Sequence, residues 1–177
     1  LIILFFSFVL QSVAAQSGDQ VFEFLTLPSS ARANALGGHT VSLVERDPSL
    51  IFHNPALLGG EMDGMINLDY MNYIADVNVG SALFTKAFRE RGAWGAGVHY
   101  FHNGKFKGMD ENNQSTGDFP ASDIAVNGFF SYDLSERWRG GVSMKFLYSN
   151  YDIYTSLGVC FDAGLSYYNS EKEFSFG

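Results

Sequence analysis

Apolar and polar residues alternate with a period of two along most of the chain from residue 65 to residue 177. Val142, Met144 and Phe146, for example, are separated by Ser143 and Lys145. Because successive side chains of an extended strand point to opposite faces, this pattern predicts strands with one apolar and one polar face. It predicts six strands and the start of a seventh, at residues 66–70, 77–83, 94–100, 123–132, 141–148, 156–167 and 174–176.

The second strand follows the same pattern. Val77, Val79 and Leu83 are expected on its apolar face, opposite Asn78, Gly80 and Ala82. The apolar faces together are expected to point outward, and the Gly-, Ser- and Asn-rich faces inward.

Two kinds of connection alternate between the predicted strands. Residues 89–92, 135–139 and 169–172 read as tight polar turns, whereas residues 103–122 read as a long acidic loop rich in Asn and Gly. Short turns at one rim and a long loop at the other, with strands of about ten residues, are typical of outer-membrane barrels. The sequence therefore predicts an all-β, transmembrane antiparallel β-barrel.

Aromatic residues are expected at both rims of this barrel, as in the girdles of membrane barrels. Those predicted near the short turns are Trp94, Tyr132 and Tyr167, and those near the long loop are Tyr100, Tyr148 and Tyr154. A soluble sandwich also has alternating strands, but its polar face normally carries more Lys and Glu than this chain has. Residues 65–177 are accordingly assigned to the first part of an outer-membrane β-barrel.

Composition excludes several classes of function. The formal net charge of -8 disfavours nucleic-acid binding and simple electrostatic adhesion to anionic lipid headgroups. The single cysteine, Cys160, excludes an intramolecular disulfide and is interpreted as a small residue of the barrel wall.

The first fifteen residues are predicted to be a signal peptide whose own start precedes this sequence. Leu1 to Leu10 form an apolar run, and Val13-Ala14-Ala15 resembles a cleavage site. The alternative is a buried N-terminal strand. No Cys follows the cleavage site, which argues against a lipoprotein anchor.

Residues 16–64 do not alternate and are predicted to be a compact, capped, irregular segment. Ser29 or Ser30 is expected to cap a short helix over residues 31–36, which Gly37 and Gly38 end with a left-handed residue. A strand-like piece is expected at residues 40–43.

Further along the same segment, a turn is expected at Asp47-Pro48. Asn54 is expected to cap one helical turn that begins at Pro55 and continues through Ala56 and Leu58. With the tight turns in the periplasm, the segment would enter the barrel from the periplasmic side, so it is predicted to be a hatch or plug. The alternative is a subdomain on the outside of a soluble sheet.

No residue pattern predicts catalysis, a cofactor or a metal site. His99 and His102 are three apart on a strand and would face opposite ways, and His39 and His53 lie in the irregular segment. Four polar side chains are expected on the inward face: Asp69, Asp123, Lys145 and Asp162. They are interpreted as part of a polar barrel wall, and the alternative is a binding or catalytic pair. The acidic loop lacks calcium-loop spacing, although it contains Asp110, Glu111, Asn112 and Asp118.

The irregular segment resembles the N-terminal hatch of the FadL-like outer-membrane barrels. The resemblance rests on Ala35-Leu36-Gly37-Gly38, Val41-Ser42-Leu43, Asp47 and Asn54-Pro55-Ala56, where the family's fuller form has Gly-Met-Gly-Gly and ends Asn-Pro-Ala-Gly. Residues 22–25, 27–28 and 30–32 are similar to the branch of this family found in type IX secretion systems. The resemblance implies a barrel of about fourteen strands with the hatch inside it.

The same resemblance implies a function and a location. The chain would be a membrane anchor in the outer membrane, contacting lipid and the complex that attaches secreted proteins to cell-surface lipopolysaccharide. A FadL-like transporter of hydrophobic small molecules is the alternative. Glu45-Arg46 and Leu57 depart from the wider family pattern, so no residue of its ligand site can be carried over.

Overall fold

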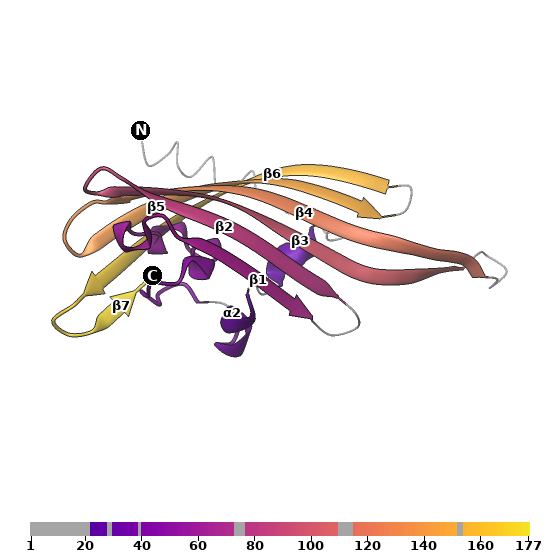
Figure 1. The fold of residues 1–177 in the computed structure, drawn as a ribbon, viewed down its shortest axis with the longest axis horizontal. Coiled ribbons are helices and arrows are strands. Elements are labelled where there is room, and N and C mark those ends of the chain that lie inside the picture. Colours follow the sequence, from indigo (N-terminus) through magenta and orange to yellow (C-terminus); the bar gives the residue numbers. More distant parts are fainter. Residues whose placement is uncertain (1–21, 28–29, 39, 73–76, 110–114, 152–153) are drawn as a thin grey trace, which may run out of the picture.

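The computed structural model describes residues 22–27, 30–38, 40–72, 77–109, 115–151 and 154–177. Within them the strands form a single antiparallel sheet in which every strand pairs with its neighbour in sequence (Figure 1). The predicted antiparallel all-β class is confirmed. The strands are β1 (Ile66–Asn72), β2 (Asn78–Phe88), β3 (Gly92–Met109), β4 (Ser115–Asp133), β5 (Trp138–Tyr151), β6 (Tyr154–Asn169) and β7 (Phe174–Phe176).

The described residues before β1 contain only short helices and irregular backbone, and are called here the N-terminal segment (residues 22–64). In Figure 1 these indigo and purple elements lie on one side of the sheet. In the described part of the chain, no helix combines the length and the apolar character needed to cross a membrane. The helices are η2 (Glu23–Thr26), α2 (Ala31–Ala35), η3 (Pro48–Phe52), η4 (Pro55–Leu57) and η5 (Gly60–Met62).

The two faces of the sheet differ in burial as the alternation predicts. In β5 the Val142 and Phe146 side chains are 53% and 51% exposed, whereas Ser143 and Leu147 are buried. We call the face that contacts the N-terminal segment the packed face, and the opposite one the apolar face. The predicted faces of β1, β3, β4, β5 and β6 agree with this division.

The prediction for β2 is wrong: its two faces are exchanged. Val79 and Leu83 lie buried on the packed face, while Phe84 is exposed on the apolar face and pairs with Ile66. The physical reason is that Leu83 packs into a hydrophobic cluster with Ile51 and other residues of the N-terminal segment. Hydrophobicity alone does not distinguish packing against that segment from facing outward.

The prediction of a long loop over residues 103–122 is also wrong. β3 and β4 continue to pair as far as Met109 and Ser115, past the ends of the neighbouring strands, as the right of Figure 1 shows. A register shift lies between His102 and Lys105. Strand pairing that starts in the apolar part continues through this stretch because backbone hydrogen bonds do not depend on side-chain polarity. Asp118 belongs to β4, while Asp110, Glu111 and Asn112 lie outside the described residues.

Among the described residues, two hydrophobic clusters are shared by the N-terminal segment and the packed face. One joins η3, η4 and η5 to β2, β3 and β4 through residues such as Ile51, Leu58 and Phe129. The other joins Phe24 to Phe101 and further residues of β1 to β5. Burial of apolar surface therefore holds the segment to the sheet.

Candidate functional site

Asn54 joins the N-terminal segment to the packed face of the sheet through several hydrogen bonds. Its side chain is buried; Oδ1 accepts a hydrogen bond from the Ala56 backbone N–H at 3.0 Å and so caps η4, as predicted. The Nδ2 group donates to the Val41 carbonyl at 2.7 Å and the Leu165 carbonyl at 3.4 Å. One side chain thus joins two parts of the segment to β6.

Two glycines of the sheet make room for this contact. Gly141 of β5 and Gly164 of β6 are directly opposite each other in the strand register. A Cβ atom on Gly141 would lie 2.4 Å from the Ala56 backbone nitrogen, and one on Gly164 would lie 2.0 Å from Asn54 Oδ1. The paired glycines therefore let η4 approach the strand backbones. The sequence alone does not reveal this pair, because the facing positions of the two glycines depend on the strand register.

Hydroxyl groups of the sheet satisfy the carbonyls at the ends of the short helices. Ser131 donates to the Leu58 carbonyl at 2.6 Å, and Thr85 donates to the Met62 carbonyl at 2.6 Å. Both side chains are buried. These bonds matter because carbonyls at a helix end have no partner within the helix.

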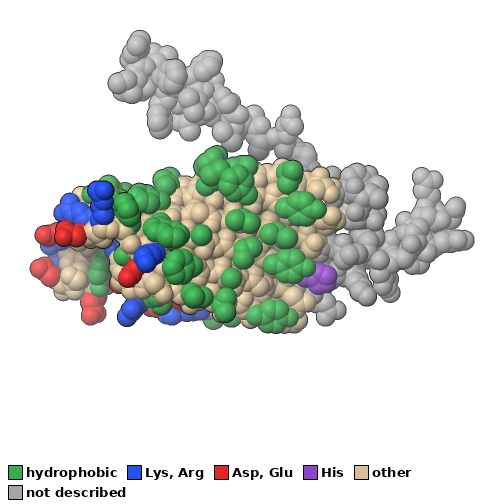
Figure 2. Space-filling model, turned by 45° about the horizontal axis from the view of Figure 1, so that its top comes forward, with side chains coloured by type: hydrophobic (Ala, Val, Ile, Leu, Met, Phe, Trp, Pro, Cys, Tyr) green, Lys and Arg blue, Asp and Glu red, His purple; other side chains and the backbone are tan. Residues whose placement is uncertain are grey.

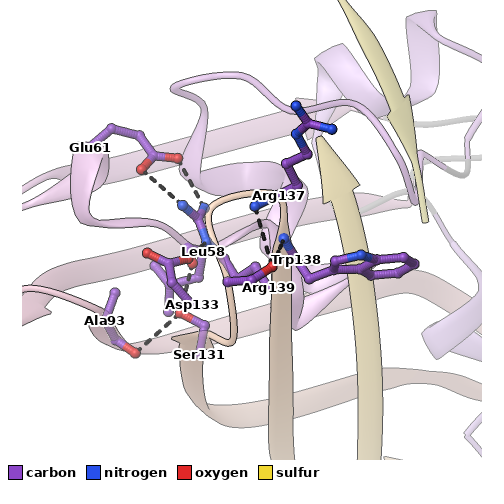
Figure 3. A network of polar contacts seen from close by, with 9 residues as sticks. Leu58, Glu61, Ala93, Ser131, Asp133, Arg137, Trp138 and Arg139 are labelled. Atoms are coloured by element: carbon purple, nitrogen blue, oxygen red, sulfur yellow. Dashed lines mark hydrogen bonds and ion pairs between the residues drawn. The ribbon is translucent and has the colours of Figure 1, made fainter. Parts of the chain in front are cut away.

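An arginine at the short-turn rim ties η5 to the sheet (Figure 3). The Arg139 guanidinium donates to Glu61 Oε1 at 3.1 Å and Oε2 at 3.4 Å, and its Nε donates to Asp133 at the end of β4. The fork of donors matches the carboxylate in a bidentate arrangement. No sequence pattern predicts this link, because Glu61 and Arg139 are 78 positions apart in the chain.

The remaining motif residues are separated by the fold. Ser30 caps α2 by accepting from the Ala33 N–H at 3.1 Å, and Gly37 and Gly38 end it with φ values of 101° and 92°, as predicted. Ala35, Leu36 and Gly37 are exposed, whereas Pro55 and Ala56 are buried against the sheet. Ser29, Pro28 and His39 lie outside the described residues.

Asp47 has a larger role than the predicted turn. Its Oδ1 accepts from the Ser49 N–H at 2.9 Å, so it caps the helix η3, and its Oδ2 accepts from Arg32 at 3.1 Å. Arg32 also pairs with Glu45. The turn prediction is therefore corrected to a helix start, and residues 40–43 are irregular backbone rather than a strand. The ion pairs of Arg32 with Glu45 and Asp47 connect α2 to this irregular stretch of backbone.

Charged and polar side chains elsewhere on the packed face are mostly paired. Lys145 Nζ lies 3.0 Å from Asp162 Oδ2, which also accepts a hydrogen bond from Ser143 at 2.6 Å, and Ser149 donates to Asp123. The ion pair borders a groove of about 450 Å³ between η4 and β6. The arrangement is that of a polar wall.

A second polar group forms a row across β1, β2 and β3. Ser81 lies opposite both Asp69 and His99, and the His99 ring stacks on Phe52 with centroids 3.8 Å apart. Ser81 stands between the acid and the imidazole, so the row does not have the nucleophile–base–acid order of a hydrolase triad. His99 and His102 lie on opposite faces, and no set of three metal-ligating side chains gathers within the described residues.

Replacing Asn54 should loosen the segment. Asn54→Leu removes the cap, at ~1 kcal/mol, and removes the hydrogen bond from Nδ2 to the Val41 carbonyl, at about 0.5–1.5 kcal/mol. Asn54→Ser keeps a capping oxygen and should lose only the second contribution. The free energy of unfolding and the rate of tryptic cleavage after Arg46 measure both effects. Equal behaviour of Asn54→Leu and wild type would contradict the central role of this side chain.

No protein-family model matches the chain, and no curated protein matches it at a significant level.

Proposed function

We propose that the chain is the first part of an outer-membrane β-barrel and that the N-terminal segment is its hatch. The observation that carries the proposal is the apolar face. Large hydrophobic side chains are exposed on it along every strand, more than a soluble sheet would leave in water. They include Ile66, Leu68, Phe84, Val98, Val126, Phe130, Val142, Phe146, Leu157, Val159, Phe161, Leu165 and Phe176.

The length of the apolar face supports a membrane crossing. Along β5, outward positions run from Trp138 to Tyr148 through Val142 and Phe146 without a charge. That span fits the about 9–11 residues of a tilted transmembrane strand. Trp138 packs on Tyr167 of β6 with ring centroids 5.0 Å apart at the short-turn rim.

The distribution of charged side chains also supports a membrane crossing, with the short turns at the water boundary. Figure 2 shows hydrophobic side chains spread over the strands, while most of the visible charged side chains gather at one end. Residues 89–91, 136–137 and 171–173, all in the short turns, supply many of the charges. A band without charge next to a charged rim is what a bilayer and its water boundary require.

The position of the N-terminal segment supports the hatch. It covers the face that a closing barrel would turn inward, and its buried contacts with the sheet are those of a filled interior rather than of an open channel. A complete barrel of about fourteen strands, as in the FadL-like family, needs as many strands again as this chain contributes.

Within that family we favour the type IX secretion branch, represented by PorQ of Bacteroidetes. The chain would act as a non-catalytic membrane anchor in the cell-surface attachment complex. The support is the motif resemblance of residues 22–32. A FadL-like transporter of hydrophobic molecules is less well supported, because the packed face carries Ser143, Lys145 and Asp162 and is covered by η4.

Two measurements test the proposal in sequence. The intact protein should fractionate with the outer membrane and migrate faster on a gel before boiling than after it. Gentle affinity purification should then recover a type IX attachment partner. Recovery without a partner, together with long-chain fatty-acid binding, would favour the transporter; absence from the membrane fraction would contradict both.

A further inference from the structure

One charged side chain interrupts the apolar face. Among the Asp, Glu, Lys and Arg side chains that the structure describes on the strands, Lys86 of β2 is the only one on this face, and it is exposed. Lys86 forms no ion pair within the described residues. A charged side chain costs free energy in the hydrocarbon layer and little near the interface. The Lys86 ammonium group is therefore expected at the bilayer surface, where an anionic group can pair with it.

The neighbours of Lys86 are those of a membrane interface. Lys86 lies directly opposite Trp94 of β3, and Trp94 packs on Phe84 with ring centroids 5.8 Å apart. Three residues beyond Lys86, the Arg89 guanidinium lies over the exposed Phe88 ring, 5.2 Å from its centroid. Lys86 and Arg89 therefore place two cations beside an aromatic surface at the short-turn rim.

The acidic groups nearby have other positions. Asp63 accepts a hydrogen bond from the Ala87 backbone N–H at 2.9 Å. Glu90 and Arg91 line a cavity at the short-turn rim that also borders Arg139. Neither Asp63 nor Glu90 forms an ion pair with Lys86. The outward side of the β2–β3 hairpin thus carries an uncompensated positive charge although the chain as a whole is acidic, at -8.

We propose that Lys86 and Arg89, with Trp94 beside them, bind the phosphate of an anionic phospholipid in the leaflet next to the short turns. The proposal rests on the proposed membrane location. Lys86 extends along the apolar face and places its ammonium group at headgroup level. Arg89 offers the same phosphate a second set of donors, and the Trp94 indole lies at the boundary between acyl chain and headgroup.

The first experiment measures lipid selectivity of the intact protein. Native mass spectrometry from nanodiscs of equal phosphatidylglycerol and phosphatidylcholine should show phosphatidylglycerol enriched on the protein. Lys86→Gln should lower this enrichment about fivefold, the effect of one basic residue near an anionic surface, whereas Lys86→Arg should keep it. Lys172→Gln, in the β6–β7 turn, is the matched control and should not change it. Excess inorganic phosphate should not displace the lipid; displacement would show a simple anion site instead.

The second experiment separates this proposal from the membrane location. In a Trp138→Phe background, Trp94 fluorescence should be quenched by lipids labelled near the headgroup and little by lipids brominated deep in the acyl chain. Shallow quenching with unchanged lipid selectivity in Lys86→Gln would overturn the phosphate site and leave the membrane location standing. No quenching by any labelled lipid would overturn both.

Discussion

Gly141→Val is expected to displace the N-terminal segment from the sheet. The first added carbon would lie 2.4 Å from the Ala56 nitrogen and from the Pro55 carbonyl carbon, both of them backbone atoms. A flexible side chain could turn aside, but η4 is fixed by the Asn54 cap and by Ser131 on the Leu58 carbonyl. Overpacking of this kind costs about 1–3 kcal/mol, and more where backbone must move.

The displacement can be measured through trypsin cleavage after Arg46. This arginine lies in the segment, and its cleavage should become much faster in Gly141→Val when the protein is held in nanodiscs. The thermal midpoint should fall as well. If the β-sheet content of Gly141→Val stays unchanged while cleavage accelerates, the N-terminal segment can leave the sheet without unfolding it, and the contact at η4 helps to hold it in place.

Gly128→Val supplies the matched control. Gly128 lies in a central strand, as Gly141 does, but a Cβ atom built on it meets nothing within 4 Å. It belongs to the apolar face, so the added methyl groups should leave cleavage and stability unchanged. Identical cleavage rates for the two valine variants would contradict the close approach of η4.

Local features of this fold could be predicted from the sequence because they depend on neighbouring residues. The caps Ser30 and Asn54 and the left-handed Gly37 and Gly38 follow from residue type and spacing alone. The alternation of β5 follows from its period of two. None of these needs knowledge of what lies opposite.

Features that depend on distant partners could not be predicted. The exchanged faces of β2 follow from Leu83 packing on η3 and η5, and the role of Gly141 follows from Gly164 lying opposite it. The Arg139–Glu61 link joins residues 78 positions apart. In each case the local sequence does not determine the arrangement, because the arrangement depends on contact with a distant part of the chain.

The extension of β3 and β4 illustrates a different limit. Asn and Gly are depleted in strands, so residue composition predicts a loop over residues 103–122. The ladder nevertheless runs through Gly108 and Gly117, although its register shifts after His102, because pairing already established along the apolar part keeps the two backbones side by side. Propensity is thus overridden by continuation of a ladder.

Val142→Arg is expected to impair membrane insertion strongly. Val142 lies on the apolar face, four residues from Trp138 and six from Tyr148, and is 53% exposed. An arginine near the bilayer midplane of a barrel strand costs about 2–4 kcal/mol. The heat-modifiable, folded form in the outer-membrane fraction should therefore fall sharply, and refolding into lipid vesicles should lose the same free energy.

Leu134→Arg distinguishes a membrane face from an ordinary exposed surface. Leu134 lies between β4 and β5 at the short-turn rim and is 59% exposed, close to the value for Val142. In a soluble sheet both substitutions would change stability by less than about 0.5 kcal/mol, because exposed sites tolerate charge. In a barrel only Val142→Arg should be costly, since Leu134 is at the water boundary. Equal yields of the two arginine variants would remove the main support for a transmembrane sheet, because exposed apolar area alone would then have no energetic consequence.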